Sequence, residues 1–359
     1  MKKKIYYWSP CLNPVGTIIS TINSVNSINK YSQTYEAYII NSCGEWNQYL
    51  DLIHESSIKV INLSFNYFKI LPKKGFWLSR FSYLIIFLIS FIPLMLLLKK
   101  NKPNTIIIHL ITSLPLILLN FFKFETKFIL RISGYPKMNY IRKFFWKKIS
   151  HKIKTVTCPT KDLKSQLIAM QIFDDKKIEF LPDAILSTNK IKLQRDNDIE
   201  NIDIINKKKL ILSVGRLTKQ KNFSYLIKEF KKFAEQNDNY CLYILGEGEE
   251  RNNLENIIKK YELQKKVFLP GFKKNVFLYM KKSEVFILSS LWEEVGFSMV
   301  EAAFNNLYLL CSDCPNGPSE FLNYGKNGIL FKSDLKDSLY KSLMKFDQFN
   351  SEKIYNDKV

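Results

Sequence analysis

The feature that most constrains the fold is a regular alternation of strand-like and helix-like segments in the second half of the chain. Short apolar runs alternate there with longer runs whose apolar residues recur at helical spacing. In chain order they are strand 210–214, helix 223–236, strand 240–245, helix 251–261, strand 267–269 and strand 285–289. Because neighbouring parallel strands need a crossover, usually a helix, this order predicts an α/β domain on a parallel sheet.

The first half opens in the same way, so a second doubly wound domain is expected. Strand 4–8 leads through a Pro- and Gly-containing loop to Gly16, Thr17 and helix 18–28. Further strands are predicted over 35–40, 58–63, 105–110, 155–159 and 178–183. A single glycine in the first loop is a weaker signal than a complete G-x-G-x-x-G motif.

Length and polarity divide the chain into domains. At 359 residues the chain is long for one core, and residues 187–209 are polar without an apolar period. We therefore expect a first domain over 1–195, a second over 205–335 and a helical, basic tail over 336–359.

Composition restricts the partners. The net charge of +21 favours anionic partners such as phosphorylated substrates, an acidic membrane or nucleic acid. Six scattered cysteines indicate a reducing compartment, and Cys311 and Cys314 have no second pair or nearby His that would complete a zinc site. The basic start has too short an apolar run for a signal peptide. A cytoplasmic location is expected.

Residues 81–98 form the most apolar run, with 18 uncharged residues. Three interpretations compete: a spanning helix, a buried core helix and a helix partly sunk into a membrane surface. Eighteen helical residues span about 27 Å, at the short limit for a bilayer. The strand pattern resumes at Thr105, so a span would divide one domain between two sides of a membrane. Core or interfacial placement is favoured.

Residues 135–154 mix seven Lys and Arg with four Tyr, Phe and Trp after Tyr135. Such a helix suits an anionic lipid surface, and the alternative is a solvated helix with its aromatic residues in the core. No nucleic-acid-binding module is recognisable, so no nucleic-acid partner is expected.

Two cations follow the first strand of the second half. Gly215 ends that strand, and Arg216 and Lys221 stand in the loop that feeds the next helix. Cations at the carboxyl end of a parallel strand suit a diphosphate, with Arg216 able to bind two oxygens at once. Alone, the loop would be an ordinary solvated basic loop.

A second element follows strand 285–289. Glu293 and Glu301 stand eight positions apart across a Gly-Phe-Ser turn that leads into a helix. The helix N-terminus offers free N–H groups to a phosphate, and carboxylates accept from sugar hydroxyls. An ordinary helix start with acidic residues is the alternative.

In order and spacing, residues 210–331 resemble the nucleotide-sugar half of retaining, family-4-type glycosyltransferases. The elements that carry this resemblance are Gly-Arg…Lys, Glu-x7-Glu, 245–251, 268–272 and 312–320. The resemblance implies the GT-B architecture, in which two Rossmann-like domains face each other across a cleft. It also implies a transferase that needs no metal or other cofactor, and no Asp-x-Asp motif stands where it would hold a metal.

The resemblance assigns roles to individual positions. Glu293 would hold donor-sugar hydroxyls, Glu301 the ribose hydroxyls, and Arg216 and Lys221 would neutralise the departing diphosphate. Phe272 would flank the base. The remaining donor-binding positions are Gly16, Thr17, Gly215 and the backbone of Gly296, Phe297, Ser298, Met299 and Val300.

Two departures from the family pattern leave alternatives open. The family usually has Glu-Gly-Phe, but here Glu294 and Val295 precede Gly296, so Glu294 could hold the sugar instead of Glu293. A His-Gly commonly follows the fourth strand of the first domain, whereas this chain has Arg131-Ile-Ser-Gly134 there. His109 is then the candidate catalytic histidine, and a buried strand-end histidine is its alternative.

The predicted function is transfer of a hexose or N-acetylhexosamine, with retention, from a UDP-sugar to a lipid-linked or surface-glycan acceptor, as in capsule or lipopolysaccharide synthesis. UDP is favoured because 313–320 resembles members that use it. Peripheral attachment to the inner face of the plasma membrane is expected. The alternatives are a nucleotide-sugar epimerase and a non-catalytic membrane-binding protein with a decayed transferase domain.

Overall fold

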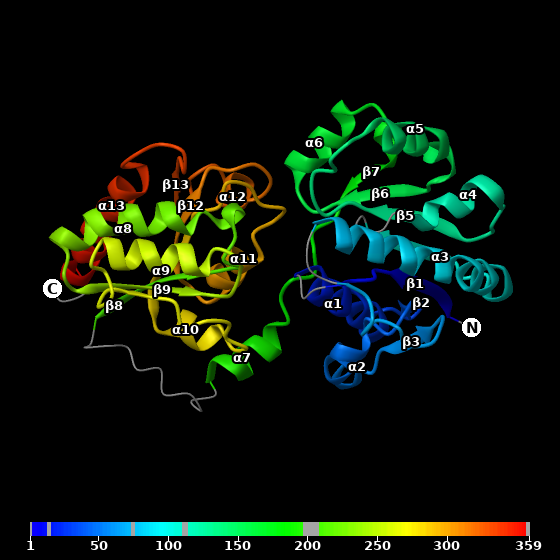
Figure 1. Cartoon of the computed structure of the whole chain (residues 1–359), viewed down its shortest axis with the longest axis horizontal. Coiled ribbons are helices and arrows are strands. Elements are labelled where there is room, and N and C mark those ends of the chain that lie inside the picture. Colours follow the sequence, from blue (N-terminus) through cyan, green and yellow to red (C-terminus); the bar gives the residue numbers. More distant parts are fainter. Residues whose placement is uncertain (1, 13–15, 73–75, 110–113, 197–207, 357–359) are drawn as a thin grey trace. The chain divides into compact units, whose positions relative to one another are not determined.

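The computed structural model describes residues 2–12, 16–72, 76–109, 114–196 and 208–356 (Figure 1). The chain divides into two compact units, Met1–Ile185 and Leu186–Val359, and each is described by itself. Predictions that fall on 13–15, on Leu110 or on 197–207 lie outside the described residues.

The first unit is built on a parallel sheet of order β3-β2-β1-β4-β5-β6-β7. Its strands are β1 (Lys3–Trp8), β2 (Tyr35–Asn41), β3 (Lys59–Asn62), β4 (Thr105–His109), β5 (Lys127–Arg131), β6 (Thr155–Cys158) and β7 (Ile178–Phe180). Its α-helices are α1 (Gly16–Tyr31), α2 (Leu50–Glu55), α3 (Phe76–Asn101), α4 (Leu118–Phe121), α5 (Tyr140–Ile149) and α6 (Lys161–Ala169). The predicted α/β fold of this half is confirmed.

Alternate side chains of these strands enter cores on opposite faces of the sheet. Tyr7 and Ile39 pack with α1 and α2 on one face. Trp8, Ile108 and Leu130 pack with α3, α4, α5 and α6 on the other. Strand order reverses between β1 and β4, and at such a switch point the carboxyl ends of the strands border the ligand crevice of an open α/β sheet.

The second unit has a parallel sheet of order β10-β9-β8-β11-β12-β13. Its strands are β8 (Lys209–Val214), β9 (Tyr240–Leu245), β10 (Val267–Phe268), β11 (Ser283–Leu288), β12 (Tyr308–Ser312) and β13 (Ile329–Phe331). Its helices are α7 (Thr188–Asp196), α8 (Phe223–Gln236), α9 (Arg251–Lys260), α10 (Phe277–Lys281), α11 (Phe297–Phe304), α12 (Pro318–Phe321) and α13 (Ser338–Asn356). Helices α8, α9 and α13 cover one face, and α7, α10 and α11 the other.

Helix α13 is fixed to this unit by a buried carboxylate. Glu229 on α8 accepts from the backbone N–H groups of Asp337 and Tyr340, each at 3.2 Å. Leu339, Leu343 and Phe346 fill the core beneath it. The segment predicted as a tail over 336–359 is, over the described residues, part of this unit.

Three further predictions differ from the structure. The boundary falls at Ile185 rather than at residue 195, and part of the predicted linker is helix α7, which places Ile191 in the core of the second unit. The predicted basic and aromatic helix over 135–154 is α-helical only from Tyr140 to Ile149, because Asn139 caps it by accepting from the N–H of Arg142. Strands β12 and β13 were not predicted.

Candidate active site

The site in the second unit begins where β8 ends. The chain turns at Gly215 and passes through a short 3-10 turn (Lys219–Lys221) into α8. The stem of Lys221 lies on Gly215, where an added Cβ would be 3.2 Å from Lys221 Cε. An added Cβ on Gly246, after β9, would be 1.9 Å from the carbonyl oxygen of Gly215. A side chain at Gly246 would therefore not fit, whereas one at Gly215 would require the stem of Lys221 to shift.

Lys221 and Glu293 form a buried ion pair. Lys221 Nζ lies 2.5 Å from Glu293 Oε1, and the two side chains are 14% and 6% exposed. Ser290 donates a hydrogen bond of 2.5 Å to the same oxygen. The carboxylate of Glu293 is thus held by a cation and a hydroxyl, which compensates the cost of burying its charge.

Three loops position this pair. The N–H of Leu291 donates to the carbonyl of Gln220 at 2.8 Å, and the N–H of Glu293 donates to the carbonyl of Pro315 at 3.2 Å. Ser289 donates through Oγ to the carbonyl of Lys221 at 2.8 Å. The loops after β8, β11 and β12 are therefore bonded to one another at the carboxyl edge of the sheet.

Helix α11 begins beside Glu293. Gly296 precedes it with φ of +83°, a left-handed conformation that favours glycine. The N–H groups of Met299 and Val300 donate to the carbonyl of Gly296 at 2.9 and 3.3 Å. The prediction that the backbone from Gly296 to Val300 is open to a ligand is therefore too broad, because these two groups are already bonded. Phe297 and Ser298, at the first two helical positions, remain for an anion.

Glu301, one turn further along α11, is an uncompensated carboxylate. Burial raises its pKa from 4.5 to about 7. Within the described residues, its carboxylate has no hydrogen-bond or ion-pair partner. A half-buried acceptor of this kind is suited to a hydroxyl-bearing ligand.

Arg216 completes the set as an exposed cation. Within the described part of the chain it makes no ion pair or side-chain hydrogen bond. Arg216 and the start of α11 can each receive an anion, and Glu301 can receive a hydroxyl. The second unit thus carries groups that can receive an anion and a hydroxyl at one edge of its sheet.

The remaining predicted donor residues lie as follows. Glu294 is exposed, whereas Glu293 is buried and bonded. Phe272 is 75% exposed and follows Gly271, which is left-handed at φ +84°. An aromatic ring so exposed is available to a base, and its role stays a prediction.

Gly16, Thr17 and His109 belong to the first unit. Gly16 and Thr17 start α1, and His109 ends β4. Their share in a donor or catalytic site stays a prediction. His109 is buried, and its Nδ1 has no hydrogen-bond partner within the described residues. Burial, followed by the positive charge of Arg131, lowers its pKa from 6.5 to about 4, so the ring is neutral near pH 7.

A buried ion pair near His109 was not found from the sequence. Arg131, at the end of β5, contacts Asp183 with Nη2 to Oδ1 at 2.8 Å, and the side chains are 5% and 4% exposed. Ser20 donates to the same oxygen at 2.8 Å, while Oδ2 of Asp183 has no partner in the described residues. The positions of these residues in the sequence could have indicated the pair. His109 and Arg131 end neighbouring parallel strands and Asp183 follows another, so all three lie at the same edge of the sheet.

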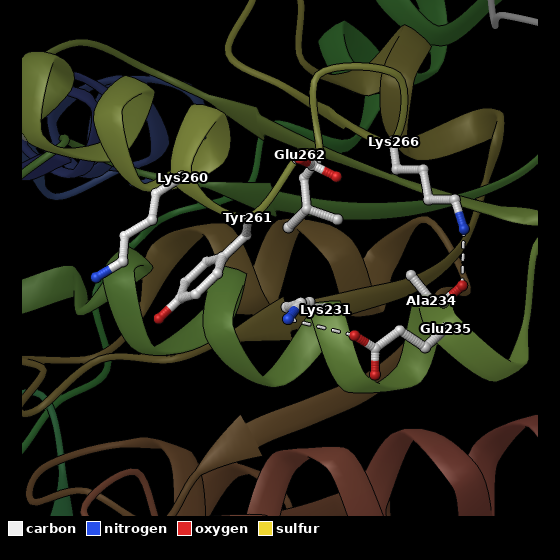
Figure 2. A pocket seen from close by; sticks show the side chains of 8 residues that line it. Lys231, Ala234, Glu235, Lys260, Tyr261, Glu262 and Lys266 are labelled. Carbon is white, nitrogen blue, oxygen red and sulfur yellow. Dashed lines mark hydrogen bonds and ion pairs between the residues drawn. The ribbon is translucent and has the colours of Figure 1, made fainter.

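The described residues contain no group of three His, Cys, Asp or Glu that could hold a metal ion. A hollow of about 420 Å³ lies between α8 and the end of α9 (Figure 2). Its polar groups already bond one another, with Lys231 3.4 Å from Glu235 and Lys266 donating to the carbonyl of Ala234 at 2.7 Å. We therefore place the candidate site at the carboxyl edge of the sheet, not in this hollow.

Two Rossmann-like parallel-sheet domains, the second with Arg216, Lys221, Glu293 and Glu301 at the carboxyl edge of its sheet, have the GT-B architecture of two-domain glycosyltransferases. The family model described as "Glycosyl transferases group 1" matches residues 194–351. An uncharacterized glycosyltransferase of Methanocaldococcus jannaschii is 30% identical over 300 residues, which cover 73% of this chain and 71% of that protein. The chain belongs to the glycosyl transferases group 1 family.

Two further similarities are informative. A Campylobacter jejuni protein named N-acetylgalactosamine-N,N'-diacetylbacillosaminyl-diphospho-undecaprenol 4-alpha-N-acetylgalactosaminyltransferase is 28% identical over 68% of this chain and 64% of that protein. The crystal structure of Anabaena HepE in complex with UDP-glucose matches with a TM-score of 0.66 over 98% of this chain and 91% of that one. At 13% identity, the second similarity shows the fold alone.

Proposed function

We propose that this protein transfers a hexose or N-acetylhexosamine, with retention of configuration, from a UDP-sugar to a lipid-linked or surface-glycan acceptor. The observation that carries the proposal is the buried Lys221–Glu293 pair, with the start of α11 beside it and an unpaired Arg216 on the same loop as Lys221. The relative named for a diphospho-undecaprenol acceptor supports the acceptor class. The choice of UDP rests on the resemblance of residues 313–320 to family members that use it.

In the proposed reaction, the bond from the anomeric carbon to the diphosphate oxygen breaks. An acceptor hydroxyl forms its new bond to that carbon from the same face, which retains the configuration. Its proton passes to the departing diphosphate. Arg216 and Lys221 stabilise the charge that develops on the leaving group, and the first N–H groups of α11 add to this field.

The carboxylates bind the donor in this scheme. Glu293 accepts from sugar hydroxyls once Lys221 turns to the diphosphate, and Glu301 accepts from the ribose hydroxyls. Because cationic side chains and backbone N–H groups supply the leaving-group stabilisation, we propose that no metal or other cofactor is required. A lipid-linked acceptor would be reached from the cytoplasmic side of the membrane, and we propose that the enzyme is attached there peripherally.

Calorimetry of the purified full-length protein with UDP, GDP, ADP and their sugars, with and without EDTA, tests the donor. Binding of UDP with unchanged affinity in EDTA is expected. If GDP or ADP bound and UDP did not, the donor would carry guanosine or adenosine instead of uridine. Loss of UDP binding in EDTA would contradict the metal-free mechanism. If no nucleotide bound, the donor assignment would fail.

A further inference from the structure

Helix α3 is apolar on its exposed side as well as on its buried side, unlike a helix on a water-facing surface. Its apolar residues run all round the helix, a pattern found where a helix is enclosed by protein or lipid. Ser82 and Ser90 are fully buried against the protein. Leucine, isoleucine and phenylalanine face outward instead, each between 43% and 62% exposed: Leu78, Phe81, Leu84, Leu88, Ile92 and Leu96.

The inward side of α3 is part of the core of the first unit. Leu94 and Leu98 pack in the cluster that covers the sheet, and Ile86 packs with residues of the 67–71 loop. Ser82 donates to the carbonyl of Pro72 at 2.6 Å. By length and composition α3 could cross a membrane, yet a spanning position would remove these contacts from the sheet. An in-plane position keeps them.

Neighbouring helices of the same layer extend the apolar surface. Helices α3, α4 and α5 all pack on one face of the first sheet. Phe91 of α3 contacts Phe122, next to α4, with ring centroids 6.5 Å apart. On α4 and α5 the exposed apolar and aromatic side chains are Phe121, Tyr140, Ile141 and Phe144, each at least 69% exposed. We call these four residues and the six outward residues of α3 the apolar face.

The segment that carries the apolar face is strongly basic. Residues 76–154 contain 14 Lys and Arg and a single acidic residue, Glu125, so their sequence charge is +13 of the chain's +21. Of these cations, Arg131 is buried against Asp183 and does not add to the surface charge. Lys99 and Lys100 stand exposed at the end of α3, and Lys147 and Lys148 at the end of α5. An exposed apolar surface bordered by cations complements the acyl chains and headgroups of an anionic bilayer.

Two arginines, one on α3 and one on α5, lie close enough for their charges to interact. The pKa of Arg142 is lowered by burial and, to a smaller extent, by the positive charge of Arg80. Arg80 is on the first turns of α3 and Arg142 on the first turn of α5. Because like charges repel, an anionic headgroup between these helix starts would stabilise both.

We propose that the apolar face is a monotopic membrane-docking surface, with α3 lying in the plane of an anionic bilayer and not crossing it. The proposal deepens the proposed function, on which it rests for the choice of a lipid-linked acceptor. An anionic bilayer is favoured over a second copy of the chain because a copy would bring a second strongly basic segment against the first.

Vesicle co-sedimentation of the full-length protein tests the surface. The test variant is Leu88→Asp with Ile92→Asp, and the matched control is Leu193→Asp with Leu335→Asp, two exposed leucines of the second unit. Vesicles of phosphatidylglycerol are compared with vesicles of phosphatidylcholine. We expect wild type and the control to bind phosphatidylglycerol vesicles, the test variant to bind at least tenfold more weakly, and alkaline carbonate to release bound protein.

Four results would overturn the proposal. They are equal binding by the test variant, no binding by wild type, resistance of wild type to carbonate, and a wild-type dimer that the test variant converts to a monomer in light scattering. We expect the circular dichroism and the UDP binding of the test variant to match those of wild type. A match would show that weaker vesicle binding comes from the altered apolar face and not from misfolding. Absence of UDP binding in wild type would instead remove the proposed function and leave the vesicle result standing.

Discussion

Lys221 Nζ and Glu293 Oε1 lie 2.5 Å apart in a part of the second unit where both side chains are largely buried. The pair joins the loop after β8 to the loop after β11. The cation and the carboxylate neutralise each other without a ligand, which stabilises the two loops, and in the proposed function the same two groups bind opposite parts of a sugar diphosphate.

Removing the cation should therefore cost stability as well as activity. Lys221→Ala leaves Glu293 buried without its ion-pair partner, and we expect the free energy of unfolding to fall by about 3 kcal/mol. Adding Glu293→Gln should restore much of this loss but no transfer activity. Urea unfolding of the wild type, the two single variants and the double variant measures these changes. The control is Lys219→Ala, at an exposed lysine of the same turn. Equal stability of Lys221→Ala and Lys219→Ala would contradict the prediction.

Arg216 should behave in the opposite way. It is exposed and unpaired within the described residues, so Arg216→Ala should leave the melting temperature unchanged. The loss of a preorganised cation at a departing diphosphate typically lowers kcat by about 100- to 1,000-fold. Steady-state transfer kinetics measure the effect, and Arg216→Lys should recover part of it. Near-normal turnover of Arg216→Ala would remove this residue from the site.

Glu301 should make stability fall with rising pH. Burial raises its pKa from 4.5 to about 7, so the folded state holds the proton more tightly than the unfolded state. Between pH 4.5 and 7 the free energy of unfolding should drop, by about 3 kcal/mol in total, and the drop is complete above pH 7. Glu301→Gln should abolish this slope in urea unfolding of the second unit. A slope that persists in the variant would assign it to another group.

The same carboxylate gives a pH signature to donor binding. If Glu301 accepts from ribose hydroxyls, the ionised form binds better, so UDP affinity should rise as pH increases from 6 to 8. The Glu301→Gln variant should bind UDP weakly and without this pH dependence. Calorimetry at three pH values makes the comparison.

His109 should have the reverse effect on the first unit. Its pKa is lowered from 6.5 to about 4, so its contribution to stability is fully present above pH 6.5 and is lost as the pH falls through 4. His109→Gln should flatten the pH dependence of unfolding between pH 6.5 and 4. His54→Gln, at an exposed histidine, is the control. Tryptophan fluorescence of a Trp292→Phe background follows this unit, which contains the other four tryptophans, Trp8, Trp46, Trp77 and Trp146. Equal slopes in both variants would count against the prediction.

Much of the second unit could be predicted because its local signals agree with its fold. Helix α8 begins at Phe223 and ends at Gln236, as predicted, since its apolar residues keep a helical period and all enter one core. Strand β12 was missed although its apolar run, 307–311, is as long as the run 210–214 that predicted β8. Helix α7 was missed because only Ile191 and its nearest apolar neighbours mark a buried side in a polar sequence.

The candidate site was predictable as a set of residues but not as a geometry. The spacing of Glu293 and Glu301 indicated a strand–loop–helix unit, which the structure contains. Spacing could not show that Glu293 already pairs with Lys221, because that contact joins loops that follow different strands. Nor could it find the Arg131–Asp183 pair, whose partners come together only when β5 and β7 enter the same sheet.

The contact of Glu229 with the start of α13 determines where a fragment that contains the second unit can end. A fragment that ended near residue 335 would leave the carboxylate of Glu229 without its two backbone donors and would uncover Leu339, Leu343 and Phe346. A fragment that started after residue 196 would lose Ile191 from the opposite core. The second unit should therefore fold in isolation only when it carries both flanking helices, α7 and α13, so its natural limits extend beyond the candidate site on either side.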